Sequence, residues 1–217
     1  MFTDGRSKKV IFLAHCLLNQ NAISDGTAVY PAAFRELIQL LLDREVGIVQ
    51  MPCPELCCLG LDRGDVYGAE RPVVVENTRI RRAMEEDGPR QRREALADQV
   101  VDQIQEYQKH GFQVLGIVGA NRSPNCGVET TSDQNRELEG QGAFLEAIAQ
   151  RLEAVGAGPE GGGRHPQESG CTAPLGGPKA GTNKRPNGGS HRPAVFNIGC
   201  VEACPSPAGL RGEAVNL

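Results

Sequence analysis

Three cysteines in this sequence lie in short loops, each directly after an apolar run, and thiols so placed are candidate metal ligands or nucleophiles. The loops are marked by proline, glycine and amide residues, and they read His15-Cys16-Leu17-Leu18-Asn19, Pro52-Cys53-Pro54-Glu55 and Asn121-Arg122-Ser123-Pro124-Asn125-Cys126-Gly127. If the three sulfurs meet, their thiolates repel one another unless a cation neutralises them, so a meeting point predicts a metal or a cluster. Three cysteine ligands leave one position open on a tetrahedral zinc ion or a cubane cluster, and an open position is typical of catalytic sites.

A second interpretation applies to any single cysteine here, because a buried cysteine is often only a small apolar side chain. We prefer that interpretation for Cys57 and Cys58, whose spacing from Cys53 matches no common cluster motif. The remaining cysteines lie in or after a stretch rich in glycine and proline and are poor ligand candidates: Cys171, Cys200 and Cys204.

The elements that must position these loops alternate between strand and helix. Short apolar runs predict buried strands at residues 10–14, 46–51 and 112–118, and helical spacing of apolar residues predicts helices at 31–44, 91–110 and 142–155, with a turn or short helix near 77–86. This order predicts an α/β fold, a three-layer sandwich around a short parallel sheet of the Rossmann or flavodoxin-like kind. Right-handed crossovers bring the carboxyl ends of parallel strands to one edge, where ligands bind, so we expect the three thiols to meet there.

The composition changes after residue 155. We expect residues 1–155 to form one cluster-binding domain and residues 156–217, which are crowded with glycine and proline, to be a disordered tail with one short strand-like run at 194–198. The tail is expected to supply no further strand to the sheet.

Composition excludes several classes of function. The net charge is −4 and aromatic residues make up 4% of the chain, which argues against nucleic acid as a partner. No apolar stretch approaches the about 20 residues of a membrane span, and no convincing signal peptide is present, so we expect a cytoplasmic protein with reduced thiols and no membrane partner. No Gly-x-Gly-x-x-Gly loop follows the first predicted strand, which argues against the simplest dinucleotide site, and the sequence has no Walker A loop.

Taken together, the three segments resemble the 2-thiouracil desulfidase (TudS-like) family, most closely its branch with His-Cys-x-Leu-Asn-x-Asn near the N-terminus. The likeness covers roughly residues 8–153, and it rests on His15-Cys16-Leu17-Leu18-Asn19-Gln20-Asn21, on Cys53-Pro54-Glu55 followed by Leu59-Gly60-Leu61-Asp62-Arg63, and on Ser123-Pro124-Asn125-Cys126-Gly127.

The resemblance implies a 4Fe-4S cluster bound by Cys16, Cys53 and Cys126, and an enzyme that removes sulfur from a small thiocarbonyl compound without redox chemistry. A soft sulfur atom suits a thiolate-bound iron, which polarises the C–S bond as a Lewis acid. Glu55 is the candidate general base, with a helix-start or surface charge as its alternative.

Three further polar residues near the cysteines are candidates for contact with substrate. Ser123 is expected to bond the substrate or water, or else to cap its loop. Asn19 and Asn21 are expected to orient substrate amides, although asparagine is also common in turns.

Two other functions remain open from the sequence. One is a non-catalytic zinc or cluster module that senses metal or redox state. The other is a hydrolase with a cysteine nucleophile, for which His15 is the nearest base. The loop after Cys16 differs from that of the characterised desulfidases, so the resemblance leaves the identity of the thiolated substrate open.

Overall fold

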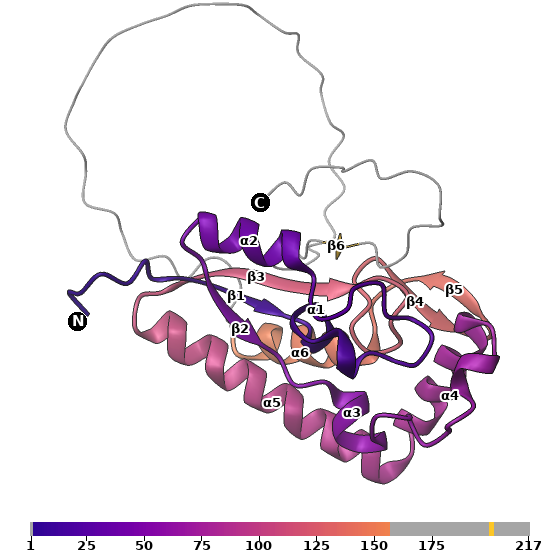
Figure 1. Cartoon of the computed structure of the whole chain (residues 1–217). Helices are drawn as coiled ribbons and strands as arrows, with labels where there is room; N and C mark the ends of the chain where they lie inside the picture. The colour runs from indigo at the N-terminus through magenta and orange to yellow at the C-terminus, as the bar shows by residue number, and fades with distance from the viewer. Residues whose placement is uncertain (1, 157–199, 202–217) are drawn as a thin grey trace, which may run out of the picture.

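The computed structural model describes residues 2–156 and 200–201. A parallel sheet runs through its centre in the order β2-β1-β3-β6 (Figure 1). The bounds of these strands are Lys9–Leu13 for β1, Gly47–Gln50 for β2, Gln113–Ala120 for β3 and Cys200–Val201 for β6. The predicted α/β class and the three predicted strands are confirmed.

Strand β6 corrects the expectation that nothing after residue 156 joins the sheet. Cys200 pairs with Gly119 and Val201 with Ala120, parallel to β3. A two-residue strand carries no periodicity of its own, so pattern reasoning has nothing to detect. The strand-like run at 194–198 and the rest of the expected tail lie outside the described residues.

Helices cover both faces of the sheet (Figure 1). Helix α2 (Arg35–Asp43) lies over one face, while α5 (Asp87–Lys109) and α6 (Ala143–Ala154) pack together on the other. Because both faces are covered, four successive side chains of β1, from Val10 to Leu13, are buried.

One boundary of each of two helices can be compared with the boundary predicted from the sequence. Gly111 follows α5 with φ +74°, and its N–H donates to Gln108 O over 2.9 Å, so the helix predicted at 91–110 ends with a glycine in the left-handed conformation. Helix α2 begins at Arg35, not at Pro31 as predicted, because Phe34 N–H donates to Leu17 O over 2.9 Å and ties that segment to the first crossover.

The shorter elements surround the carboxyl edge of the sheet. Helix α4 replaces the predicted turn or short helix near residues 77–86, and the sequence reasoning missed the antiparallel hairpin β4–β5. Their bounds are His15–Leu18 for α1, Gln20–Ala22 for η1, Pro54–Leu59 for α3, Gly68–Glu70 for η2, Val73–Met84 for α4, Thr130–Asp133 for β4 and Arg136–Glu139 for β5. None of the helices in the part of the chain described here is both long and apolar enough to cross a bilayer.

The loop between β3 and β4 is packed so closely that it requires glycine. A Cβ atom added to Gly127 would lie 2.8 Å from Ser123 O and closer still to Thr130 O, both of which are backbone atoms that cannot move aside. The conformation of the loop that carries Cys126 therefore requires a glycine at position 127.

We predict that Gly127→Ala lowers the free energy of unfolding by about 1–3 kcal/mol, the usual cost of overpacking. The matched control is Gly88→Ala, because Gly88 lies in α5 with open space around its Cα. Alanine there should be neutral or stabilise the protein by up to about 1 kcal/mol. Urea unfolding measures both, and equal stability of the two variants would contradict the packing account.

Candidate functional site

The three cysteines line one cavity at the carboxyl edge of the sheet. Its volume is about 150 Å³, and its lining includes Cys16, Cys53 and Cys126. Each follows a different strand: Cys16 lies in α1 after β1, Cys53 precedes α3 after β2, and Cys126 lies in the loop after β3. The order of the parallel strands thus accounts for the meeting of three residues that are distant in sequence.

Cys53 is held as the N-cap of α3. Leu56 N–H donates to Cys53 Sγ over 3.4 Å, and Pro54 occupies the first turn of the helix, where its missing N–H costs nothing. Arg63 Nη2 lies 3.9 Å from the same sulfur. The Cys53 sulfur therefore has two donors directed at it before any ligand arrives.

Cys126 is held by the hydroxyl group of Ser123. Ser123 Oγ accepts hydrogen bonds from Cys126 N–H over 2.9 Å and from Asn125 N–H over 3.3 Å. This is the loop-capping role that the sequence left as one of two possibilities for Ser123. Because Ser123 also lines the cavity, its own O–H hydrogen remains available there.

All three thiols are held in their protonated form. Burial, followed by the charge of Glu55, raises the pKa of Cys16 to about 11 and that of Cys53 to about 12. Burial raises the pKa of Cys126 well above its usual value, and negative charge on Cys16 and Cys53 adds to the effect. A charge on Cys16 or Cys53 thus opposes ionisation of Cys126. A cation or cluster that bound here would displace their protons.

Glu55 is buried in the same cavity and paired with Arg63. Arg63 Nε lies 3.0 Å from Glu55 Oε2, and the two side chains are only 3% and 8% exposed. Asn125 Nδ2 donates to Glu55 Oε1 over 2.9 Å, and Ser24 Oγ lies 3.4 Å from Oε2. The carboxylate predicted from its spacing to Cys53 is thus a buried, oriented acceptor.

The guanidinium of Arg63 is fully engaged by the protein. Besides Glu55 and Cys53, it donates to the carbonyl oxygens of Gly60, Leu61 and Ala22 over 2.7, 3.2 and 2.6 Å. These five partners match its five N–H groups. Arg63 therefore joins the cysteine loop to two other segments and has no donor left for a ligand.

Asn19 and Asn21 do not lie on the cavity. Asn19 Oδ1 accepts hydrogen bonds from the backbone N–H and the Nδ2 of Asn21, over 3.2 and 3.1 Å, and so caps the short helix η1. The structure does not bring these two residues to the cavity, since their amides bond within the turn that follows Cys16, and their contact with substrate stays a prediction. Neither Cys57 nor Cys58 is among the residues that line the cavity.

Sequence reasoning missed several polar residues around the thiols. Arg63 and Asn77 line the cavity, and Asn125 donates a hydrogen bond to Glu55. Arg63 stands in the quoted segment after Cys53, so a signal was present. Asn77 lies on α4, outside every quoted motif, and only the three-dimensional arrangement brings it to the site.

The donor set fits a cluster better than a single metal ion. Within residues 2–156 and 200–201, no group of three His, Cys, Asp or Glu side chains is placed to hold one metal ion. A cluster makes a different demand, because each cysteine binds a different iron and the sulfurs surround the cluster rather than one atom. Cys16, Cys53 and Cys126 line one cavity, so they are the residues that would hold a cluster here.

The chain is similar to an uncharacterized protein of Methanocaldococcus jannaschii, MJ0003. The two are 29% identical over 126 residues, which are 57% of this chain and 70% of that protein. No protein-family model and no solved structure matches the chain. The likeness assigns no chemistry, so the geometry of the site has to supply it.

We predict slow alkylation of the pocket thiols by iodoacetamide in the metal-free protein. With pKa values of about 11 and 12, Cys16 and Cys53 should react about 100-fold and about 1,000-fold more slowly at pH 8 than an ordinary thiol. Their rates should still rise about tenfold per pH unit between pH 8 and 10. The same cysteines in urea serve as the control, and a plateau near pH 9 in the folded protein would contradict the raised pKa values.

We also predict that Arg63→Met lowers the free energy of unfolding by about 3–5 kcal/mol, because it leaves Glu55 buried without its partner. Arg92→Met is the control, since Arg92 is exposed on α5. Its effect should stay within about 0.5 kcal/mol. A similar loss in both variants, measured by urea unfolding, would show that the buried pair is not the cause.

Proposed function

We propose that this chain binds a 4Fe-4S cluster through Cys16, Cys53 and Cys126 and removes sulfur from a small thiocarbonyl compound. The observation that carries the proposal is the grouping of three thiols and one buried carboxylate, Glu55, around a single cavity. The cluster, when bound, would supply a Lewis-acidic iron with an open position for the sulfur of the substrate.

The reaction balances with water as the only co-reactant. The carbon–sulfur double bond of the substrate breaks, and a carbon–oxygen double bond forms from the oxygen of one water molecule. Both hydrogens of that water leave with the sulfur as hydrogen sulfide, so no electron is transferred to or from the protein. The protein therefore has to activate one water molecule.

Glu55 is the group that accepts the proton of that water. An ionised carboxylate offers about four acceptor positions, and Arg63, Asn125 and Ser24 use three of them. The fourth position remains for a water molecule in the cavity. The surrounding hydrogen bonds hold the carboxylate in one orientation, as a positioned base requires.

Ser123 holds the substrate or the attacking water from the other side. Its oxygen accepts two backbone N–H groups, so the direction of its remaining hydrogen is limited. It therefore acts as an oriented donor beside Cys126.

A cysteine-nucleophile hydrolase is less well supported. A nucleophilic cysteine needs a depressed pKa or an adjacent base, whereas burial raises the pKa of Cys16, Cys53 and Cys126. Burial also lowers the pKa of His15, so this residue provides no imidazolium to stabilise a thiolate. The cysteines whose side chains the structure describes are free thiols, which supports our proposal of a reducing, cytoplasmic setting.

The proposal predicts about four iron atoms per chain and broad visible absorption after anaerobic reconstitution with iron and sulfide. It also predicts sulfide release from 2-thiouracil or a related thiolated base. Cys126→Ala should lose both the iron and the activity. A colourless protein that holds one zinc ion per chain would contradict the proposal.

Glu55→Gln should keep the iron but lower kcat for sulfide release by about 10²–10⁴, the usual contribution of a general base. Circular dichroism and iron content must match the unmodified protein for this comparison to hold. Unchanged kcat in an iron-loaded Glu55→Gln variant would remove Glu55 from the mechanism.

A further inference from the structure

The side chain of Asn77 is held in one orientation beside the thiol cavity. Asn77 lies on α4, is only 7% exposed, and lines the cavity. Its Nδ2 donates to Arg122 O over 3.1 Å and to Ser132 Oγ over 3.3 Å. Because a carbonyl oxygen can only accept, Arg122 O must face the amide nitrogen, which fixes the direction of the amide.

The other end of this amide, Oδ1, is an acceptor open to the cavity. Within residues 2–156, no described donor reaches Asn77 Oδ1. The fully enclosed side-chain atoms without a partner in that part of the chain are Arg93 Nε, Arg122 Nε and Asn125 Oδ1, so Asn77 Oδ1 is not enclosed. Because Asn77 lines the cavity, a ligand there is the partner that this oxygen can find.

Most of the hydrogen-bonding capacity left in the cavity is acceptor capacity. All five N–H groups of Arg63 are engaged, as described above. The hydroxyl hydrogens of Ser24 and Thr27 point to Glu55 Oε2 and Ser24 O, over 3.4 and 2.6 Å, so these two groups offer only lone pairs. A ligand that carries N–H donors would complement these acceptors, while the hydroxyl hydrogen of Ser123 remains as a donor to the ligand or to water.

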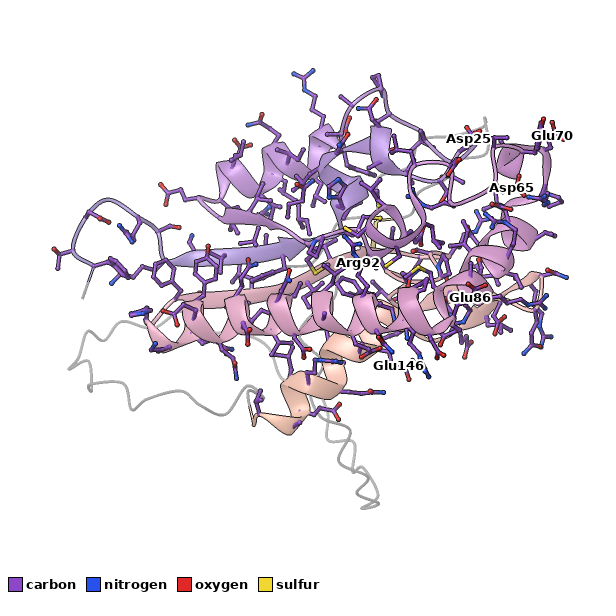
Figure 2. The ribbon with its side chains drawn as sticks, turned by 90° about the horizontal axis from the view of Figure 1, so that it is seen from below. Asp25, Asp65, Glu70, Glu86, Arg92 and Glu146 are labelled. Carbon is purple, nitrogen blue, oxygen red and sulfur yellow. The ribbon has the colours of Figure 1, made fainter. Side chains whose placement is uncertain are left out.

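The two arginine side chains that line the cavity are each paired with a carboxylate, Arg63 with Glu55 and Arg122 with Glu137, which disfavours an anionic ligand. Gly26 lies against Ala69, with 3.3 Å between an added Cβ and the Ala69 methyl group, so the loop that lines the cavity contacts η2. Acidic side chains flank this contact, and Asp25, Asp65 and Glu70 lie together at this end of the molecule (Figure 2). The cation at the opposite rim, Arg122, faces Glu137 across 3.4 Å.

We infer that Asn77 Oδ1 accepts a hydrogen bond from a ring N–H of a neutral thiolated heterocycle, in which the N–H adjoins the thiocarbonyl carbon. This inference rests on the proposed function for the identity of the substrate, and it adds a residue that selects among such compounds.

Binding of 2-thiouracil and its methyl derivatives to the reconstituted protein tests the inference, with ligand-observed NMR as the readout. Methylation of either ring nitrogen removes one N–H, and at one of these two positions it should weaken binding about tenfold, the upper range for a neutral hydrogen bond. A control compound carries the methyl group on the C–H carbon next to a ring nitrogen. This methyl group adds similar bulk but removes no N–H donor, so it should weaken binding less. Equal weakening by all three methyl groups would overturn the inference without any protein variant.

The protein side of the test uses Asn77→Leu, which nearly preserves volume and removes the acceptor. In this variant the tenfold penalty for N-methylation should disappear. Ser132→Ala is the matched control, because it removes one partner of the Asn77 amide and of Arg122 O but leaves Oδ1 in place. It should keep the penalty, and persistence of the penalty in Asn77→Leu would overturn the inference.

Sulfide release measured in the same samples separates this inference from the proposed function. Suppose that N-methylation at one position weakens binding, that Asn77→Leu removes this penalty, and that no sulfide is released. The inference then holds and the desulfidase proposal fails. If sulfide is released but N-methylation costs nothing at either position, the desulfidase proposal holds and the role of Asn77 is wrong.

Discussion

The ion pair between Glu55 and Arg63 is the contact on which the arrangement of the cavity depends. Both side chains are removed from water, and a buried charge without its partner would cost several kcal/mol. Arg63 meets this requirement while it also binds the carbonyl oxygens of Ala22 and Gly60 and approaches the sulfur of Cys53. One guanidinium thus draws together the loops after β1 and β2.

The same pair affects the protonation of the neighbouring thiols. The negative charge of Glu55, added to burial, keeps Cys16 and Cys53 protonated in the metal-free protein. Thiols in this state are poor nucleophiles but become ligands when a cationic centre displaces their protons. The carboxylate, with its charge balanced by Arg63, remains an acceptor beside them. The proposed desulfidase reaction would need both properties in one cavity.

The sequence predicted the parts of the fold that have strong periodicity. The strands around Phe12, Ile48 and Val114 are short apolar runs, and each is followed by a loop that carries a cysteine, so the common edge of the three thiols could be foreseen. Strand β6 and the β4–β5 hairpin could not, because the first is two residues long and the second alternates no apolar residues. The site divides in the same way. Glu55 lies two residues from a cysteine and was visible, whereas Asn77 reaches the cavity only through the packing of α4, which local spacing does not reveal.

Mössbauer spectroscopy of the protein reconstituted with ⁵⁷Fe tests the central claim most directly. If three cysteines bind a four-iron cluster with one open position, one iron site differs from the other three, and its isomer shift changes when 2-thiouracil is added. The account would be contradicted if no iron site changed its isomer shift on addition of 2-thiouracil, or if the protein took up no cluster iron.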